Sequence, residues 1–170
     1  MKAYVQVYTG DGKGKTTASL GLALRAAGAG LKVYIGQFLK KGDYSEIKAL
    51  KKFENITTEQ FGLLHFVKGK PSDEDMEAGK KGYQRLCEVL RNNEHDIVIA
   101  EEANIAFMCG LITEDELLSL IDIRPDNVEL IFTGRGAPLS LMKRADLVTE
   151  MKEIKHYFQK GVQARTGIEK

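Results

Sequence analysis

The chain has 170 residues, of which 43% are hydrophobic, and its 25 basic and 24 acidic residues leave a formal net charge of +1. This length suits one well-filled core and is short for two, so we expect residues 1–170 to form a single domain. Because the charges are interspersed, the sequence lacks the concentrated basic face that nucleic-acid binding needs, and we expect no polynucleotide partner.

The cysteine spacing and the hydropathy indicate which kinds of site and which cell compartment to expect. Cys87 and Cys109 are far apart and form no Cys-x-x-Cys pair, so we expect core or half-buried thiols in place of a zinc site or a disulfide framework. The chain enters its first strand pattern without an apolar leader, and no apolar run approaches the ~18 residues of a membrane span. We therefore expect a cytoplasmic protein that does not enter a membrane.

The first elements predict a β-α-β unit. Residues 4–8 alternate and are rich in β-formers, residues 17–29 are rich in Ala, Leu and Gly at helical spacing, and residues 32–38 form a second strand. A short amphipathic stretch at 45–53 and a weaker strand at 56–61 follow.

The remainder of the chain continues this alternation. Ser72 and Thr113 open capping boxes, which predict a long helix through Leu90 and a shorter one through Ile121. Between them, residues 96–100 are continuously apolar after Asp96, as in a strand buried on both faces. Later strands are expected at 128–133 and 147–151, and Pro138 is placed as the first residue of another helix. These elements predict an α/β fold, a mostly parallel sheet with helices on both faces.

A glycine-rich loop joins the first strand to the first helix. Its glycines let successive backbone N–H groups face one anion, and the following helix directs its positive dipole end to the same place. Gly14-Lys15-Thr16 fits the P-loop pattern, although the leading glycine stands at position 10 in place of 9. We therefore predict a P-loop NTPase-like nucleotide site made of Thr9, Gly10, Asp11, Gly12, Lys13, Gly14, Lys15, Thr16 and Thr17.

Two further groups follow strands and should lie at the same edge of the sheet, where ligands bind in such folds. Glu101 and Glu102 end the buried strand at the place where P-loop proteins hold Mg²⁺, and we take Glu102 as the metal ligand together with Thr16. Arg135 lies between two glycines and can contact phosphate oxygens. Lys15, Glu102 and Arg135 are the expected catalytic residues.

The chain resembles the P-loop ATP:corrinoid adenosyltransferases almost end to end. The likeness rests on residues 8–17, Gln37-Phe38-Leu39-Lys40, residues 96–104, Thr133-Gly134-Arg135, and a tail with Lys155-His156-Tyr157-Phe158, Gly161 and residues 164–169. Three differences stand out. Asp11 replaces an Asn, and Glu101 replaces an Asp. Better-known members carry a Phe and a Trp after the third strand, whereas this chain has no Trp and reads Gly62-Leu63-Leu64-His65-Phe66.

The resemblance implies that ATP is a substrate, with Mg²⁺, and that the Co(I) of a reduced corrinoid attacks C5′ of its ribose while the whole triphosphate leaves. It also implies a homodimer and a flavoprotein that supplies the electron to cobalt. A corrinoid would then be lined by aromatic and imidazole groups near the second and third strands, and the expected set is Phe38, Phe61, His65 and Phe66.

Two other functions use the same residues. A P-loop kinase or NTPase would transfer or hydrolyse the γ-phosphate with the same loop and acidic pair. A nucleotide-dependent switch is the non-catalytic alternative, but the chain carries no guanine-reading Asn-Lys-x-Asp element.

Overall fold

One parallel sheet forms the centre of the protein. The computed structural model describes residues 2–42, 44–65, 67 and 69–169. Their six strands pair in the order β3-β2-β4-β5-β1-β6, and every pair is parallel. The strands are β1 (Val5–Thr9), β2 (Val33–Gln37), β3 (Ile56–Gln60), β4 (Ile97–Glu101), β5 (Glu129–Thr133) and β6 (Leu147–Glu150). The predicted α/β fold is confirmed.

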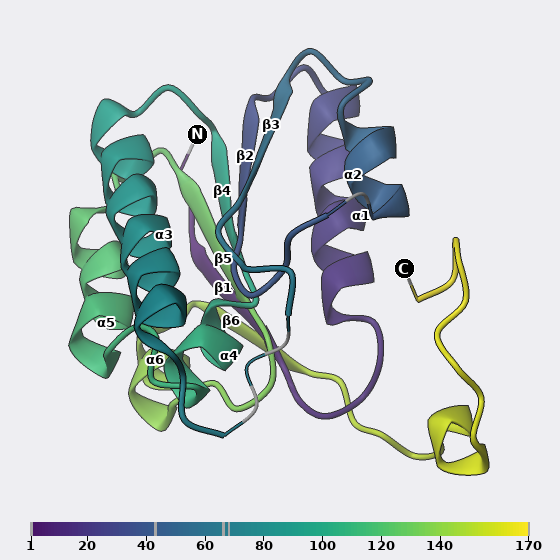
Figure 1. The fold of residues 1–170 in the computed structure, drawn as a ribbon. Helices are drawn as coiled ribbons and strands as arrows, with labels where there is room; N and C mark the ends of the chain where they lie inside the picture. Colours follow the sequence, from purple (N-terminus) through teal and green to yellow (C-terminus); the bar gives the residue numbers. More distant parts are fainter. Residues whose placement is uncertain (1, 43, 66, 68, 170) are drawn as a thin grey trace.

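Helices cover both faces of the sheet (Figure 1). One face is covered by α1 (Lys15–Gly28) and α2 (Ser45–Leu50). The other face is covered by α3 (Asp73–Asn92), α4 (Ala103–Met108), α5 (Glu114–Ile123) and α6 (Leu139–Arg144). A 3₁₀ turn, η1 (Tyr157–Lys160), lies in the C-terminal tail. Because helices lie on both faces, all five residues of β4 are buried, as the apolar run predicts.

Most sequence signals for the helices are confirmed. Ser72 and Thr113 both form complete capping boxes, at the starts of α3 and α5. Two details differ. Helix α4 was not predicted, because six residues give too short a period to recognise. Pro138 precedes α6 as its N-cap, with ψ of 148°, so the helix begins one residue later, at Leu139.

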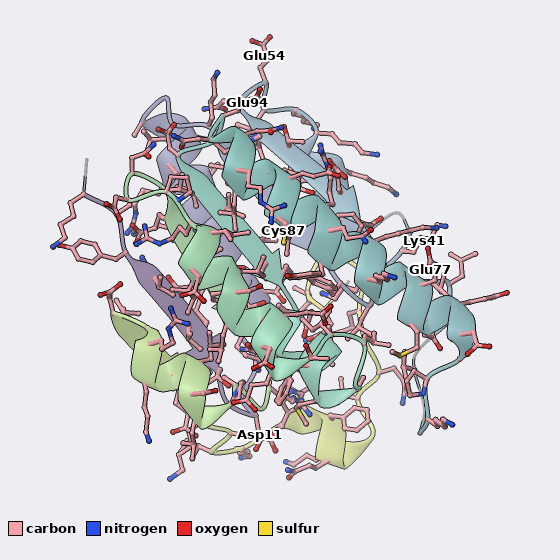
Figure 2. All side chains as sticks on the ribbon, turned by 90° about the vertical axis from the view of Figure 1, so that its left-hand side faces the viewer. Asp11, Lys41, Glu54, Glu77, Cys87 and Glu94 are labelled. Carbon is pink, nitrogen blue, oxygen red and sulfur yellow. The ribbon has the colours of Figure 1, made fainter. Side chains whose placement is uncertain are left out.

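The strands run in one direction, so the loops that follow them meet at one end of the molecule. In Figure 2, Asp11, which follows β1, lies at the opposite end from Glu54 and Glu94, which precede β3 and β4. Strands β4, β5 and β1 are direct neighbours. Their loops are therefore brought side by side. Cys87 is a buried residue of α3 and Cys109 is half-buried, both as free thiols, as expected.

Candidate active site

A cavity of about 960 Å³ opens where these loops meet. Gly12 to Thr17 line it together with Glu102 and Arg135, so the three separate sequence signals contribute to one site. A cavity of this volume is within the range of those that hold nucleotides and cofactors.

Thr9, Gly10 and Asp11 were expected to bind nucleotide, but they are not among the residues that line the cavity. Thr9 is buried at the end of β1, where its hydroxyl accepts a hydrogen bond from the Ala137 amide at 3.2 Å. Asp11 is exposed.

The loop is packed against the chain that follows β6. The Gly12 amide donates to the Met151 carbonyl at 2.6 Å, and the Met151 amide donates to the Thr9 carbonyl at 2.8 Å. A Cβ at Gly10 would lie 2.5 Å from the Met151 oxygen, and one at Gly12 would lie 2.6 Å from it. Glycine is therefore needed at both positions for close approach of the backbone.

Lys15 lies across the loop. Its ammonium donates to the carbonyls of Gly10 and Gly12, each at 2.7 Å. Burial lowers the pKa of Lys15, and the positive charge of Arg135 lowers it further. A bound anion would offset both effects, because it would stabilise the charged form of the Lys15 ammonium.

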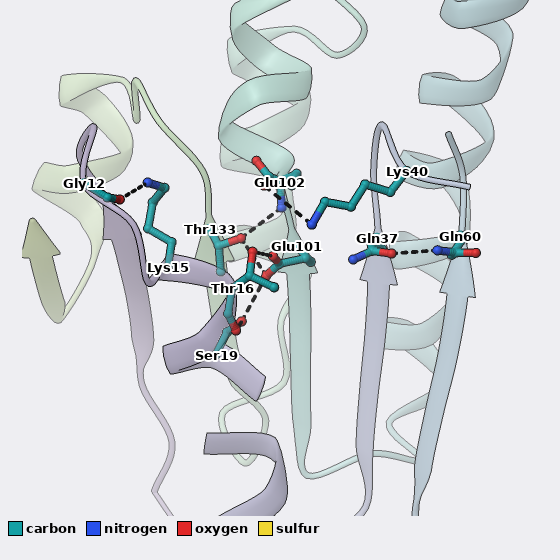
Figure 3. Close-up of polar contacts among 10 residues, drawn as sticks. All are labelled: Gly12, Lys15, Thr16, Ser19, Gln37, Lys40, Gln60, Glu101, Glu102 and Thr133. Atoms are coloured by element: carbon teal, nitrogen blue, oxygen red, sulfur yellow. Dashed lines mark hydrogen bonds and ion pairs between the residues drawn. The ribbon is translucent and has the colours of Figure 1, made fainter. Parts of the chain in front are cut away.

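Glu101 is fully buried beneath the loop and accepts three hydroxyl groups (Figure 3). Ser19 donates to it at 2.9 Å and Thr133 at 2.7 Å, and the Thr16 hydroxyl donates to its other oxygen. The carboxylate thus ties β4, β5 and α1 together. Since Thr16 gives its proton to Glu101, the lone pairs of its oxygen stay available for a cation.

Glu102 lines the cavity in a left-handed backbone conformation, with φ of 60°. Its amide donates to the Thr133 hydroxyl at 2.9 Å, which holds this conformation, and its carboxylate lies 3.9 Å from the Lys40 ammonium. Burial raises the pKa of Glu102, with a further increase from the charge of Glu101. A bound cation would stabilise the ionised form of Glu102 and so offset this increase in pKa.

Arg135 reaches the cavity from the turn after β5. Gly134 has φ of 124°, and a Cβ there would lie 3.0 Å from the Ile105 amide nitrogen. The buried Asn104 side chain donates to the Gly134 carbonyl at 3.1 Å. These contacts fix the turn while the arginine itself is exposed to solvent.

The residues expected to line a corrinoid do not form an open wall. Phe38 is 1% exposed and belongs to the core, where its ring packs on Phe61 at 5.9 Å. His65 lies 3.1 Å from Asp75. Phe38, Phe61 and His65 surround a cavity of only about 10 Å³, far too small for a corrinoid. Phe66 lies outside the described residues.

The oxygen groups at the site suit a magnesium ion. The Thr16 hydroxyl and the two neighbouring carboxylates are the hard oxygen donors that Mg²⁺ prefers. In the described part of the chain, no three His, Cys, Asp or Glu side chains gather into a metal-binding group. The Thr16 hydroxyl and the Glu102 carboxylate would fill only part of the octahedral shell of Mg²⁺, which leaves places for substrate phosphates.

Several site residues were given no role by the sequence reasoning, although some of them belong to motifs that carry the resemblance. Ser19 and Thr133 complete the Glu101 cluster, and Lys40 pairs with Glu102. Ser19 lies one helical turn after Lys15 and Thr16, which is the only signal the sequence offers for it. Tail residues also line the cavity, namely His156, Gly167, Ile168 and Glu169.

Comparisons with known proteins agree with the geometry. Residues 1–169 match the family model described as ATP:corrinoid adenosyltransferase BtuR/CobO/CobP. A corrinoid adenosyltransferase of Pseudomonas aeruginosa is 31% identical over 165 residues, which are 96% of this chain and 81% of that protein. One of Escherichia coli K12 is 29% identical over 168 residues, 99% of this chain and 86% of that protein.

None of the helices in the described ranges is long and apolar enough to cross a bilayer. The phosphate loop, the acidic pair and the arginine turn lie together on a parallel sheet, and the match extends over nearly the whole sequence. The chain therefore belongs to the ATP:corrinoid adenosyltransferase family.

Proposed function

We propose that the protein transfers the 5′-deoxyadenosyl group of ATP to the Co(I) of a reduced corrinoid and releases tripolyphosphate. The observation that carries this proposal is the single cavity shared by Gly12 to Thr17, Glu102 and Arg135, in a chain whose family is defined by that reaction. Cobalt supplies the electron pair of the new Co–C5′ bond and becomes formally Co(III). The C5′–O bond breaks, and its pair leaves with the triphosphate.

In this reaction the protein stabilises a departing polyanion. We assign the amides of residues 13–17 to the triphosphate, with Lys15, Lys13 and Arg135 as the cations that offset the charge that develops on the leaving oxygen. Lys15 would exchange the two loop carbonyls it now contacts for phosphate oxygens. The attacking atom is on the substrate, so the protein needs no nucleophile of its own.

We assign the magnesium ion to Thr16 and Glu102. Glu102 lines the cavity, whereas Glu101 is fully buried and accepts three hydroxyls. Glu101 therefore acts as a positioning residue for the Thr16 hydroxyl. The ion, when bound, supplies positive charge to the phosphate oxygens.

Product analysis tests this function against phosphoryl transfer. Anaerobic incubation with MgATP and chemically reduced cobalamin should give a Co–C bond, visible as an absorbance change, and one tripolyphosphate per adenosylated product. Chelation of Mg²⁺ should slow the same reaction. Recovery of ADP and orthophosphate, without an adenosylated corrinoid, would show a kinase or NTPase and refute the proposal.

We also propose that a flavoprotein supplies the electrons that keep cobalt as Co(I), and that the reaction takes place in the cytoplasm, where ATP and such reductants are available. The support is the chemistry of the two substrates. Replacing the chemical reductant in the same assay with a reduced flavoprotein tests the first point, since failure to form any Co–C bond there would exclude it.

A homodimer is the proposed assembly. The support is the family resemblance together with β6, an edge strand whose four residues are all exposed, including Leu147 and Val148. An exposed apolar edge of this kind is suited to burial against another chain. Sedimentation equilibrium should give twice the chain mass at micromolar concentration, and a monomer there would refute this assignment.

A further inference from the structure

The C-terminal tail after β6 is the part of the chain that the proposed reaction leaves without a role. Residues 152–169 are mostly exposed and carry only the short turn η1. Figure 1 shows this tail in yellow, running outward from β6 and then back beside α1 and α2. Such an exposed segment needs specific contacts to keep one position.

The tail is fixed at its start to the phosphate loop. Met151 exchanges hydrogen bonds with Gly12 and Thr9, at 2.6 and 2.8 Å. The direction in which the tail leaves the body is therefore coupled to the conformation of the loop. The tail begins beside the phosphate loop, and its later residues His156, Gly167, Ile168 and Glu169 line the same cavity as the loop.

The tail is also closed on itself by a clasp that consists of Tyr157, Arg165 and Glu169. The Tyr157 hydroxyl donates to the Glu169 carboxylate, and the Arg165 amide and guanidinium donate to it at 2.9 to 3.2 Å. The guanidinium lies 5.1 Å from the centre of the Tyr157 ring. Hydrogen bonds from Arg165 and Tyr157 lower the pKa of Glu169 to about 2, so the clasp is charged at neutral pH.

The closed tail presents one apolar side chain to the cavity. Ile168 is 55% exposed, and it lines the cavity together with His156 and Gly167. The same cavity is lined by Leu20 of α1 and by Glu46 of α2. Aliphatic side chains and one carboxylate therefore line the part of the cavity beside the phosphate loop. A lining of this kind suits a purine nucleoside.

The cavities on the other side of the site involve no tail residue. A separate cavity of about 530 Å³ lies next to β3 and α3 and is lined by Phe61, Leu63 and Ala78 among others. Leu39 and Val67, which are near that end, also line the main cavity. The tail contributes to the main cavity alone, on the side of α1 and α2.

We propose that the C-terminal tail forms the nucleoside-binding wall of the site, with Ile168 packing against the adenosine part of ATP and the clasp holding Ile168 in place. This inference rests on the proposed function, because it takes ATP as the ligand whose triphosphate occupies the loop. Ile168 is then a binding residue for the nucleoside, and Tyr157 is a positioning residue that acts through Glu169.

Two ligands separate the nucleoside from the phosphates. Calorimetric titration of the full chain with MgATP and with magnesium tripolyphosphate should show that Ile168→Ser weakens MgATP binding about 10-fold, because the variant loses apolar contact with the nucleoside. Tripolyphosphate binding should stay within about twofold of wild type. Tyr157→Phe should show the same selective loss, since it removes the hydroxyl that holds Glu169.

Ile154→Ser is the matched control, because Ile154 is 84% exposed and is not among the residues that line the cavity. It should bind both ligands as wild type does. Wild-type MgATP affinity in Ile168→Ser, or an equal loss for both ligands, would overturn the inference. A wild-type protein that binds MgATP but forms no adenosylated corrinoid would instead refute the proposed function and leave the tail assignment standing.

Discussion

Replacing Lys15 with alanine should lower kcat/KM for MgATP by about 100-fold or more, the usual size of the loss when one preorganised charge or donor is removed from a developing anion. Lys15 is the half-buried cation of the loop, and its ammonium already lies between two loop carbonyls at 2.7 Å. Alanine is a good helix former at the start of α1, so the fold should persist. Steady-state kinetics of Co–C bond formation measure this loss.

Lys143→Ala is the control for that variant. Lys143 is exposed in the last turn of α6 and does not line the cavity, so its loss should leave kcat/KM unchanged. Tripolyphosphate should also bind Lys15→Ala more weakly than it binds wild type, because the ligand contains the group that Lys15 is assigned to hold. Full activity of Lys15→Ala would refute the assignment of the loop to the triphosphate.

The second large effect separates the two neighbouring carboxylates. Glu102→Gln should raise the Mg²⁺ concentration needed for half-maximal activity by about 10-fold or more, since an assigned ligand is lost from the cavity. Its free energy of unfolding should change little, because the Glu102 side chain is replaced by a neutral group of the same shape and the nearby Lys40 is partly exposed. Measuring the initial rate at increasing Mg²⁺ concentrations gives the half-maximal Mg²⁺ concentration.

Glu101→Gln should change both the Mg²⁺ requirement and the free energy of unfolding. The metal requirement should rise by about 10- to 100-fold, as for other residues that orient a ligand. The protein should also lose about 1–3 kcal/mol of stability, because an amide cannot accept all three buried hydroxyls. Urea unfolding measures this change in the free energy of unfolding. An unchanged metal requirement in Glu102→Gln, alongside a raised one in Glu101→Gln, would transfer the ligand role to Glu101.

The general fold and the three segments that line the main cavity could be predicted because the signals are local. Capping boxes at Ser72 and Thr113, the apolar run of β4 and the glycine-rich loop each depend on residues close in the sequence. The rule that ligands bind at the carboxyl ends of parallel strands then brought Lys15, Glu102 and Arg135 together.

The parts that could not be predicted depend on contacts between distant residues. Glu101 and Glu102 are equivalent by sequence position, and only packing shows that one is buried under Ser19 and Thr133 while the other faces the cavity. The burial of Phe38 has the same origin, since it depends on Gly82 of α3, where a Cβ would lie 2.7 Å from the Phe38 ring. The sequence likewise offers no signal that the tail returns to the cavity.

The pairing of β1 with β6 has a consequence for biosynthesis. The phosphate loop is synthesised before β5 and β6, yet its Gly12 amide is satisfied by Met151, and β1 lies between those two later strands. A nascent chain therefore cannot complete the nucleotide site until β6 and Met151 have left the ribosome. Newly made protein should acquire its substrate affinity only after β6 has paired with β1.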